Sequence, residues 1–313
     1  MKPLQVGTRS SALARWQTRF VVDAMRGIDP TLALEVVELS TAGDEFPEAL
    51  IADLEGTGLF TSALERALLA GEIDVAVHSF KDLPVEPHPA LSIAAVPERG
   101  AVEDVLCGLD DASIATLPRG AKVGTSSARR SAQLRRMRPD LELAPLRGNV
   151  PTRIARVRRG DLDAVVLARA GLERLGLMRH VTQIFAVSEL LPAPAQGALA
   201  VQVRAADSAL ARRLGGLDHA PSRRAAECER AVLHLLAGGC AVPVGASAIS
   251  SGDEIRLIAG VFDTAGDRSA RIECSGREVA EVARHAALAL DQAGAREILE
   301  QFARSVRVTP EVS

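Results

Sequence analysis

The sequence predicts an α/β protein with two lobes built on mainly parallel sheets, followed by a small C-terminal α+β domain. Short apolar strands alternate with amphipathic helices through the first two-thirds of the 313 residues, a pattern typical of parallel sheets. Two segments recur in the same order, and the pattern changes near Asp218. We therefore expect the first lobe at 1–97 and 198–216, the second at 102–192 and the C-terminal domain at 218–313.

Each recurring segment contains a junction between a strand and a helix. V-G-T-R-S-S-A-L-A-R at 6–15 returns as V-G-T-S-S-A-R-R at 123–130, and in both a serine can cap the helix or donate to an oxyanion. A helix end, a glycine turn and a buried strand occur at 68–77 and again at 158–167. Identities this short also arise by chance, so the order of the two pairs is what favours a structural repeat.

Arginines are concentrated between residues 123 and 153, in a chain of formal net charge -3. The stretch has two acids, Asp140 and Glu142. Its arginines are Arg129, Arg130, Arg135, Arg136, Arg138, Arg147 and Arg153. Guanidinium groups match carboxylate or phosphate, and the free N–H groups at a helix start favour anions too. Ligands of parallel sheets bind beyond the carboxyl ends of the strands, so we expect a polyanion between the lobes.

The remaining elements follow from composition and spacing. The Pro- and Gly-rich segment 191–204 becomes strand-like at its end and predicts a hinge that returns the chain to the first lobe. Beyond it we expect a helix at 222–236, a hairpin within 256–274 and a long helical stretch at 278–304.

Composition excludes several classes of protein. One Trp, no Tyr and a slightly acidic balance argue against a nucleic-acid partner, and no apolar run is long enough to span a bilayer. The segment 1–11 has no apolar h-region, so we expect a cytoplasmic protein. The cysteines form no C-x-x-C pair, which argues against a metal site, and Cys107, Cys228 and Cys274 are expected in the core.

The motif H-S-F-K-D-L-P at 78–84 follows a buried strand predicted at 74–77. It therefore lies at a carboxyl end, and Asp82 is the best candidate for an acid, a base or a group that stabilises a cation. The alternative is that Asp82 pairs with Lys81 or caps a helix, and His78 is better explained as a hydrogen-bonded structural residue.

Cys240 and the segment 42–60 each have two interpretations. Cys240 follows two glycines, so its thiol could be accessible as a nucleophile or an attachment point, although a buried structural cysteine fits the residues alone better. The acidic, glycine-bearing segment 42–60 is either a mobile lid or a solvated connection.

Several motifs in one order resemble the porphobilinogen deaminase (hydroxymethylbilane synthase) family over nearly the full chain. They are G-T-R-S-S-A-L-A, G-L-F, D-V-A-V-H-S-F-K-D-L-P, V-G-T-S-S-A-R-R, L-R-G-N-V-P-T-R, L-A-R-A-G-L-E-R-L-G and G-G-C-A-V-P-V-G. The resemblance implies two lobes like those of periplasmic binding proteins and a third domain.

The resemblance also implies an activity and a cofactor. Members of the family join four porphobilinogen units head to tail into hydroxymethylbilane and release ammonia at each addition. They carry a dipyrromethane cofactor on a thioether, which here would be formed by Cys240. The family is usually monomeric and acts on a small molecule, without a nucleic acid or a membrane.

Site residues are transferred where the motifs match. Asp82 would be catalytic: it would protonate the leaving amine, stabilise the cationic pyrrole and help to remove the last pyrrole proton. The residues that would hold the cofactor, besides Cys240, are Lys81, Thr125, Ser126, Ser127, Arg129, Arg130 and Gly148. The residues that would bind substrate are Arg9, Ser11, Arg147, Arg153 and Arg174. No metal is implied.

The chain departs from the family at three positions. Asp53 and Thr57 stand where many members have lysines, and Ala195 stands where glycine is common, which would stiffen the hinge. Two alternatives are a non-catalytic bilobal anion-binding protein, which would have no use for Asp82 or Cys240, and a phosphoribosyltransferase. The latter would need a diphosphate loop and magnesium carboxylates, for which the sequence offers no convincing candidate.

Overall fold

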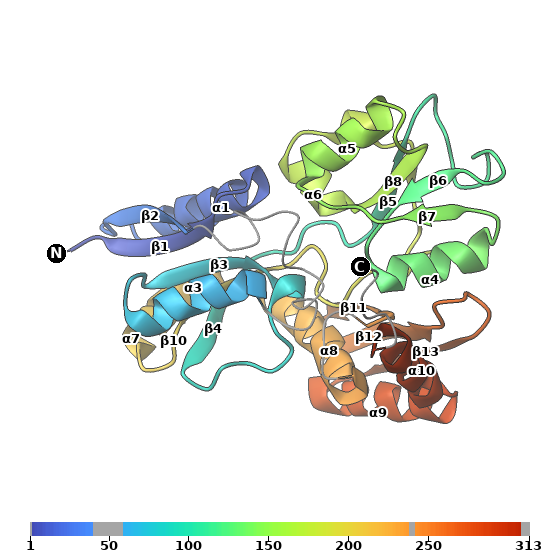
Figure 1. Ribbon diagram of the computed structural model, residues 1–313. Coiled ribbons are helices and arrows are strands. Elements are labelled where there is room, and N and C mark those ends of the chain that lie inside the picture. The colour runs from blue at the N-terminus through green and yellow to red at the C-terminus, as the bar shows by residue number, and fades with distance from the viewer. Residues whose placement is uncertain (1, 40–58, 238–241, 308–313) are drawn as a thin grey trace.

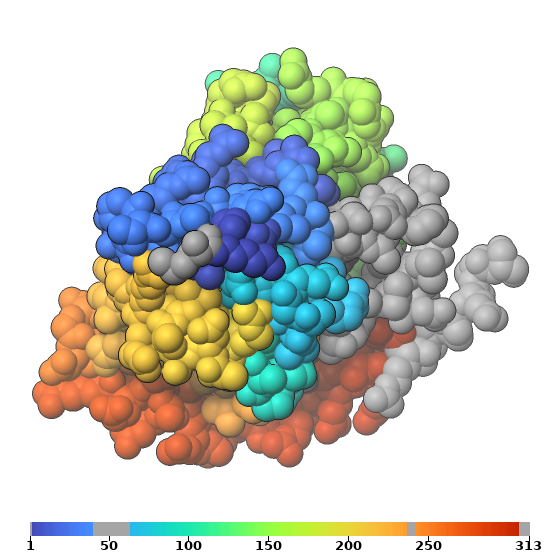
Figure 2. All heavy atoms as spheres, turned by 90° about the vertical axis from the view of Figure 1, so that its left-hand side faces the viewer, coloured from blue at the N-terminus to red at the C-terminus, as the bar shows by residue number. Residues whose placement is uncertain are grey.

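The computed structural model describes residues 2–39, 59–237 and 242–307, and Figure 1 shows their arrangement around three sheets. The first and second sheets have five strands each and belong to two α/β lobes. The third has three strands and belongs to the C-terminal part of the chain. Seen from the side in Figure 2, the first lobe lies between the second lobe above it and the C-terminal part below it.

The first lobe is built on a sheet with the strand order β2-β1-β3-β10-β4. Its strands are β1 (Leu4–Arg9), β2 (Leu34–Leu39), β3 (Val75–Ser79), β4 (Leu91–Ala95) and β10 (Leu199–Arg204). Its helices are α1 (Ala12–Ile28), α3 (Leu59–Ala70) and α7 (Ser208–Leu214), and it includes the 3-10 turns η1 (Phe80–Asp82) and η3 (Gly215–Leu217). Valines of β1, β3 and β10 pack on the buried face of α1, which carries Val21, Val22 and Met25.

The second lobe has the corresponding order, β7-β6-β8-β5-β9. Its strands are β5 (Asp104–Gly108), β6 (Lys122–Gly124), β7 (Glu142–Ala144), β8 (Ala164–Ala168) and β9 (Gln183–Ile184). Its helices are α4 (Ala128–Met137), α5 (Val150–Arg158) and α6 (Arg169–Arg174), and η2 (Met178–His180) is a 3-10 turn.

The two-lobed α/β class is confirmed, but both sheets are mixed. In each, four strands run in the same direction and one runs against them: β10 is antiparallel to β3 and β4, and β5 is antiparallel to β8 and β9. The reason is the path of the chain. Each exceptional strand enters its sheet directly from the other lobe, β5 through the first crossover (residues 96–103) and β10 through the second crossover (residues 185–198).

The internal repeat is confirmed down to single hydrogen bonds. In the first lobe, the amide of Asp74 donates to the Gln5 carbonyl at 2.8 Å, and the Asp74 carboxylate accepts from the Gln5 amide at 3.0 Å. In the second lobe, Asp163 and Lys122 make the same two bonds, at 2.9 and 2.7 Å. The aspartate that follows each glycine turn therefore joins the new strand to the first strand of its unit.

The two crossovers lie side by side. The Gly100 amide donates to the Gly197 carbonyl at 3.2 Å. Gly197 has φ +85°, and a Cβ there would lie 2.5 Å from the Ala101 carbonyl oxygen, so only glycine allows this approach. The second crossover thus returns the chain to the first lobe, as the sequence predicts, in close contact with the outgoing segment.

The C-terminal part is a small α+β unit. Its helices are α8 (Ala220–Ala237), α9 (Val279–Gln292) and α10 (Ala295–Arg307), and its strands are β11 (Val244–Ser251), β12 (Glu254–Phe262) and β13 (Ser269–Gly276). The predicted hairpin is β12–β13, paired in antiparallel fashion. The single helical stretch expected at 278–304 is wrong, because Gly294 with φ +92° separates α9 from α10.

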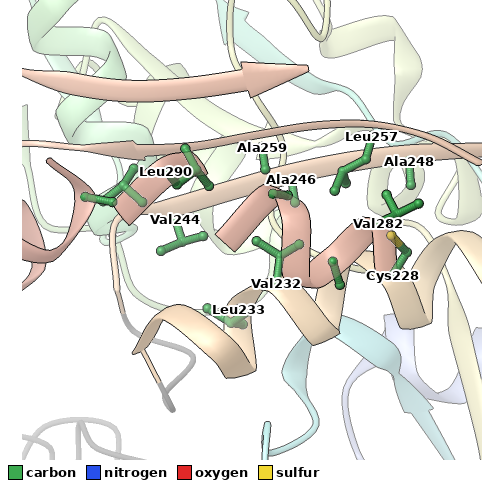
Figure 3. Packing of buried hydrophobic residues seen from close by; sticks show 14 of the residues in the cluster. Cys228, Val232, Leu233, Val244, Ala246, Ala248, Leu257, Ala259, Val282 and Leu290 are labelled. Atoms are coloured by element: carbon green, nitrogen blue, oxygen red, sulfur yellow. The ribbon is translucent and has the colours of Figure 1, made fainter. Parts of the chain in front are cut away.

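The core of this unit lies between the sheet and the helices. Figure 3 shows Cys228, Val232 and Leu233 of α8 gathered with Val244 and other strand residues. Cys228 is fully buried, and burial raises the pKa of its thiol to about 12. Two further cysteines, Cys107 and Cys274, are buried or half-buried, so the expectation of three core cysteines is confirmed.

Candidate active site at the crossovers between the lobes

The turn η1 presents Lys81 and Asp82 at the carboxyl end of β3. It is joined to the second crossover twice: the Phe80 amide donates to the Ala198 carbonyl at 3.0 Å, and Lys81 Nζ donates to Gln196 Oε1 at 3.2 Å. Burial lowers the pKa of Lys81 to about 8, although the charge of Asp82 opposes the shift. The Lys81 ammonium group therefore loses its charge at a pH only slightly above neutral.

The second lobe contributes two buried arginines, which lie at the start of α4. Arg129 Nη1 donates to Asp104 Oδ2 at 2.8 Å and to the Leu191 carbonyl at 2.6 Å. Arg130 Nη2 donates to Asp104 Oδ1 at 2.7 Å and its Nη1 to the Val166 carbonyl at 3.0 Å. Both arginines are less than a tenth exposed, so water screens little of their positive charge.

Asp104 balances that charge. Burial alone would raise the pKa of its carboxyl group, but the adjacent Arg129 and Arg130 hold the pKa well below its usual range. Gln196 Nε2 also donates to Asp104 Oδ1, at 2.9 Å. A hydrogen-bonded chain therefore runs from Lys81 of the first lobe through Gln196 of the second crossover to Asp104 and the arginines of the second lobe.

The two arginines retain capacity for an anion. The Nε atoms of Arg129 and Arg130 are buried, and neither has a hydrogen-bond partner among the described residues. A buried N–H group left without an acceptor is costly. Carboxylates of a bound ligand are suitable acceptors, so these donors fit a ligand that carries several carboxylates.

The loop before α4 is held by its own hydroxyl groups. Ser126 Oγ donates to the Leu146 carbonyl at 3.0 Å and accepts from the Leu146 amide at 2.8 Å, so its O–H is already engaged. Ser127 is the N-cap of α4, and its Oγ accepts from the Arg130 amide. Thr125 is buried, and its Oγ1 accepts from the Ser127 amide. These residues shape the loop that carries the arginines.

The start of α5 places Arg153 beside the same group of charges. Its Nε donates to the carbonyl of Gly148, which has φ +93°, at 2.7 Å. Burial and the charge of Arg130 lower the pKa of Arg153, whereas Asp82 opposes the shift. Arg153 therefore lies within electrostatic range of Arg130 in its own lobe and of Asp82 in the first lobe.

The other predicted substrate-binding residues are more dispersed. Arg9 ends β1, Ser11 is the N-cap of α1, and Arg147 is exposed in the loop before α5. Arg174 donates to the Gly197 carbonyl at 2.6 Å, and its guanidinium lies 5.7 Å from the centre of the Trp16 ring in α1. Arg174 is thus placed between the two lobes and the second crossover.

Some predictions fall outside the described residues. They concern Cys240, the lid at 42–60 except for its last two residues in α3, and the departures at Asp53 and Thr57. The helix α8 ends at Ala237, three residues before Cys240 in the sequence. Ala195, by contrast, is described: it adopts φ +59°, a conformation in which glycine is less strained.

Sequence reasoning missed the acids and amide that organise the site, Asp104, Gln196 and Glu229. Arg99 of the first crossover makes a bidentate pair with Glu229 of α8 at 2.7 and 2.8 Å, with both side chains buried. The available signal was an acidic residue inside an apolar pattern, since Asp104 precedes V-L-C and Glu229 lies on the buried face of a helix.

One hollow lies away from the predicted site residues. It measures about 580 Å³ and is lined by Arg119, Arg138, Pro139 and Asp140. Within the described ranges, no group of three or more His, Cys, Asp or Glu side chains could hold a metal ion. In the same ranges, no helix has the length and apolar character needed to cross a membrane.

Comparisons with known proteins identify the family. The family described as "Porphobilinogen deaminase, dipyromethane cofactor binding domain" matches residues 4–212, and "Porphobilinogen deaminase, C-terminal domain" matches residues 224–295. The porphobilinogen deaminase of Thermobifida fusca is 47% identical over 273 residues, covering 87% of this chain and 85% of that protein. That of Syntrophomonas wolfei is 42% identical over 301 residues, covering 96% of this chain and 98% of that protein.

A solved structure, the periplasmic VFT2 domain of Bordetella pertussis BvgS, is a distant likeness. It is 17% identical with a TM-score of 0.43, covering 68% of this chain and 85% of that one, and nothing about the site depends on it. The matches in sequence do decide the family, because they extend over both lobes and the C-terminal part. The chain belongs to the porphobilinogen deaminase family.

Proposed function

We propose that this protein joins four porphobilinogen molecules head to tail into hydroxymethylbilane, with release of one ammonia at each addition. The protein is thus a transferase of tetrapyrrole biosynthesis that uses a dipyrromethane cofactor. The observation that carries the proposal is the hydrogen-bonded chain that joins Lys81, next to Asp82 in one lobe, through Gln196 and Asp104 to the arginines of the other lobe, Arg129 and Arg130.

The residues around Arg129 and Arg130 would hold the cofactor. Both guanidiniums offer buried Nε donors to its carboxylates, Lys81 adds a positive charge, and Cys240 would form the thioether. The loop residues Thr125, Ser126, Ser127 and Gly148 would fix the two helix starts. When bound, the dipyrromethane supplies the pyrrole carbon to which the first substrate is joined.

The catalytic work falls to Asp82. It would donate a proton to the departing amino group, face the cationic pyrrole that remains and receive the proton that the condensation releases. A single carboxylate can do this because proton transfer and charge stabilisation are required at the same place. Arg9, Ser11, Arg147, Arg153 and Arg174 would bind the acetate and propionate groups of substrate and growing chain.

The proposal includes the setting of the reaction. We place the enzyme in the cytoplasm as a monomer that acts on a small molecule, with neither nucleic acid nor membrane as partner. Its domains would be 1–97 with 198–216, then 102–192, then 218–313. The acidic balance, with Asp+Glu 40 against Lys+Arg 37, favours neither nucleic acid nor anionic membranes. Analytical ultracentrifugation of the purified protein tests the monomer.

Intact mass tests the proposal directly. After expression in a cell that makes porphobilinogen, the protein should exceed its sequence mass by two substrate-derived pyrrole units, located on the peptide that contains Cys240. A mass equal to that of the bare sequence would contradict the cofactor and favour a non-catalytic anion-binding protein.

Asp82→Ala tests the assignment of the catalytic acid. The variant should keep the bound cofactor but lose about 10²- to 10⁴-fold in kcat, the usual range for removal of a general acid or base. Glu86→Ala, which removes an exposed carboxylate four residues away, should turn over like the wild type. Near-normal turnover in the Asp82 variant would remove this residue from the mechanism.

A further inference from the structure

Arg230, on α8 of the C-terminal part, binds the turn that carries Asp82. Its Nη1 donates to the carbonyls of Phe80 and Leu83, each at 3.1 Å, and its Nη2 donates to the carbonyl of Pro84. The guanidinium also lies over the ring of Phe80, 4.7 Å from its centre. One side chain therefore contacts the turn through three backbone carbonyls and one aromatic face.

The turn needs such a partner because its backbone satisfies few of its own acceptors. A 3-10 turn of three residues makes little internal hydrogen bonding, and here the Leu83 amide reaches the Phe80 carbonyl at a long 3.4 Å. Pro84 has no N–H to continue the pattern. Phe80 and Leu83 are both buried, so carbonyls left without donors there would be costly.

The position of Arg230 on α8 links the turn to the crossovers. The adjacent Glu229 pairs with Arg99 of the first crossover and accepts from the Ala195 amide of the second at 2.6 Å. Ala226, one helical turn earlier, packs in the same cluster as Phe80. The helix therefore fixes the catalytic turn and both crossovers with residues from two successive turns.

We infer that Arg230 is a positioning residue, which sets the place of the Asp82 carboxylate relative to the helix that leads to Cys240. This inference rests on the proposed function. The helix continues from Arg230 to Ala237, about 10 Å at 1.5 Å per residue, and Cys240 follows three residues later. The guanidinium itself need not touch substrate, because it acts on the carbonyls that define the turn.

The test compares Arg230→Met with Arg224→Met in the full-length, cofactor-loaded protein. Arg224 lies on the same helix and also donates to carbonyls, those of Gly252, Asp253 and Arg277, but all of these belong to the C-terminal part. Arg230→Met should lower kcat about tenfold to a hundredfold with KM for porphobilinogen nearly unchanged, as expected for a misplaced catalytic group. Arg224→Met should leave kcat close to that of the wild type.

Two further variants guard against a purely structural effect. Arg230→Lys keeps the charge and part of the donor capacity, so it should restore part of the lost kcat. In the Asp82→Ala background, Arg230→Met should cause no further loss in the single-turnover rate, because its effect passes through the missing carboxylate. If Arg230→Met does not fold, Phe80→Leu, which removes the stacked ring, should show a smaller loss in kcat in the same direction.

Unchanged kcat in Arg230→Met, an equal loss in Arg224→Met, or full additivity with Asp82→Ala would each overturn the inference. Intact mass separates this failure from failure of the proposed function. A wild-type protein without the two pyrrole units would refute the function itself. Loaded variants that turn over normally would refute only the role of Arg230.

Discussion

The two lobes use one strand–helix unit for opposite chemistry. Ser11 and Ser127 cap α1 and α4 in the same way, but two residues later the first lobe has Leu13 and the second has Arg129. The antiparallel strands β10 and β5 also differ by an apolar and a charged residue, because β10 has Leu199 where β5 has Asp104.

The strand register shows that these positions correspond. Leu199 of β10 lies opposite Ser79 of β3, and Asp104 of β5 lies opposite Ala168 of β8, the residue that matches Ser79 in the repeat. Two apolar positions in one lobe thus correspond to a buried ion pair in the other. Buried guanidinium groups need a partner as deeply buried as themselves, so the arginines and the aspartate belong together.

The candidate site is divided between the two lobes by single residues on a common frame. The repeat gives both lobes the same frame, whereas single substitutions give the second lobe its positive charge and the first lobe its carboxylate. The strand β3 leads into F-K-D at 80–82, whereas the matching residues after β8 are R-A-G at 169–171, without the acid. The proposed catalytic acid and the arginines therefore come together only where the lobes face each other.

Asp104→Asn should have the largest effect, because it leaves two buried guanidinium groups without a counter-charge. We expect a loss of about 3–5 kcal/mol in the free energy of unfolding, the usual cost of breaking a buried ion pair. Urea denaturation followed by circular dichroism measures it. Asp140→Asn, which breaks the more exposed pair with Arg138, should move the urea midpoint far less. Equal shifts in the two variants would mean that Asp104 does not hold the arginines.

His78→Leu gives the first lobe the residue found at the matching position of the second, Leu167. Burial lowers the pKa of His78 to about 4, with a partial opposing effect from Gln202. Since the unfolded value is about 6.5, the unfolded chain binds more protons between pH 6.5 and pH 4, and stability falls as the pH drops through that window.

In the wild type this histidine should cost about 2–3 kcal/mol of stability between pH 7.5 and pH 4.5. The Leu variant should lack that part of the acid sensitivity, as seen in urea midpoints at both pH values. His88→Leu, at an exposed position, should keep the wild-type pH dependence. A wild-type profile in His78→Leu would show that the buried imidazole is not the sensitive group.

Asp163→Ala and Asp74→Ala should have the smallest effects on stability. Their order tests whether the equivalent hydrogen bonds of the two lobes contribute equally. Asp163→Ala removes the acceptor of one amide, for a loss of about 1 kcal/mol. Asp74→Ala should cost about 2 kcal/mol, because Asp74 also accepts from Arg204 at 2.7 Å. Thermal unfolding measures both, and the reverse order would contradict the equivalence of the two bonds.

Much of the fold could be predicted because it depends on local patterns. The glycine turns, the serine caps and the alternation of strands and helices predict two similar lobes, and the hairpin β12–β13 also follows from its residues. The break at Gly294 was missed, since one glycine in an amphipathic stretch is compatible with a continuous helix. The antiparallel direction of β5 and β10 depends on chain crossings that no local pattern records.

The sequence by itself determined that arginines lie at helix starts, that an acid follows a buried strand, and that the chain belongs among the porphobilinogen deaminases. These are properties of short segments, whose residue order is enough to define a cap, a turn or a motif. Only the tertiary structure decided that Asp104 neutralises Arg129 and Arg130. It also decided that Gln196 connects Asp104 to Lys81, and that Arg230 donates to the backbone of the turn that contains Asp82. Those pairs join residues up to 150 positions apart, and burial rather than proximity in sequence selects them.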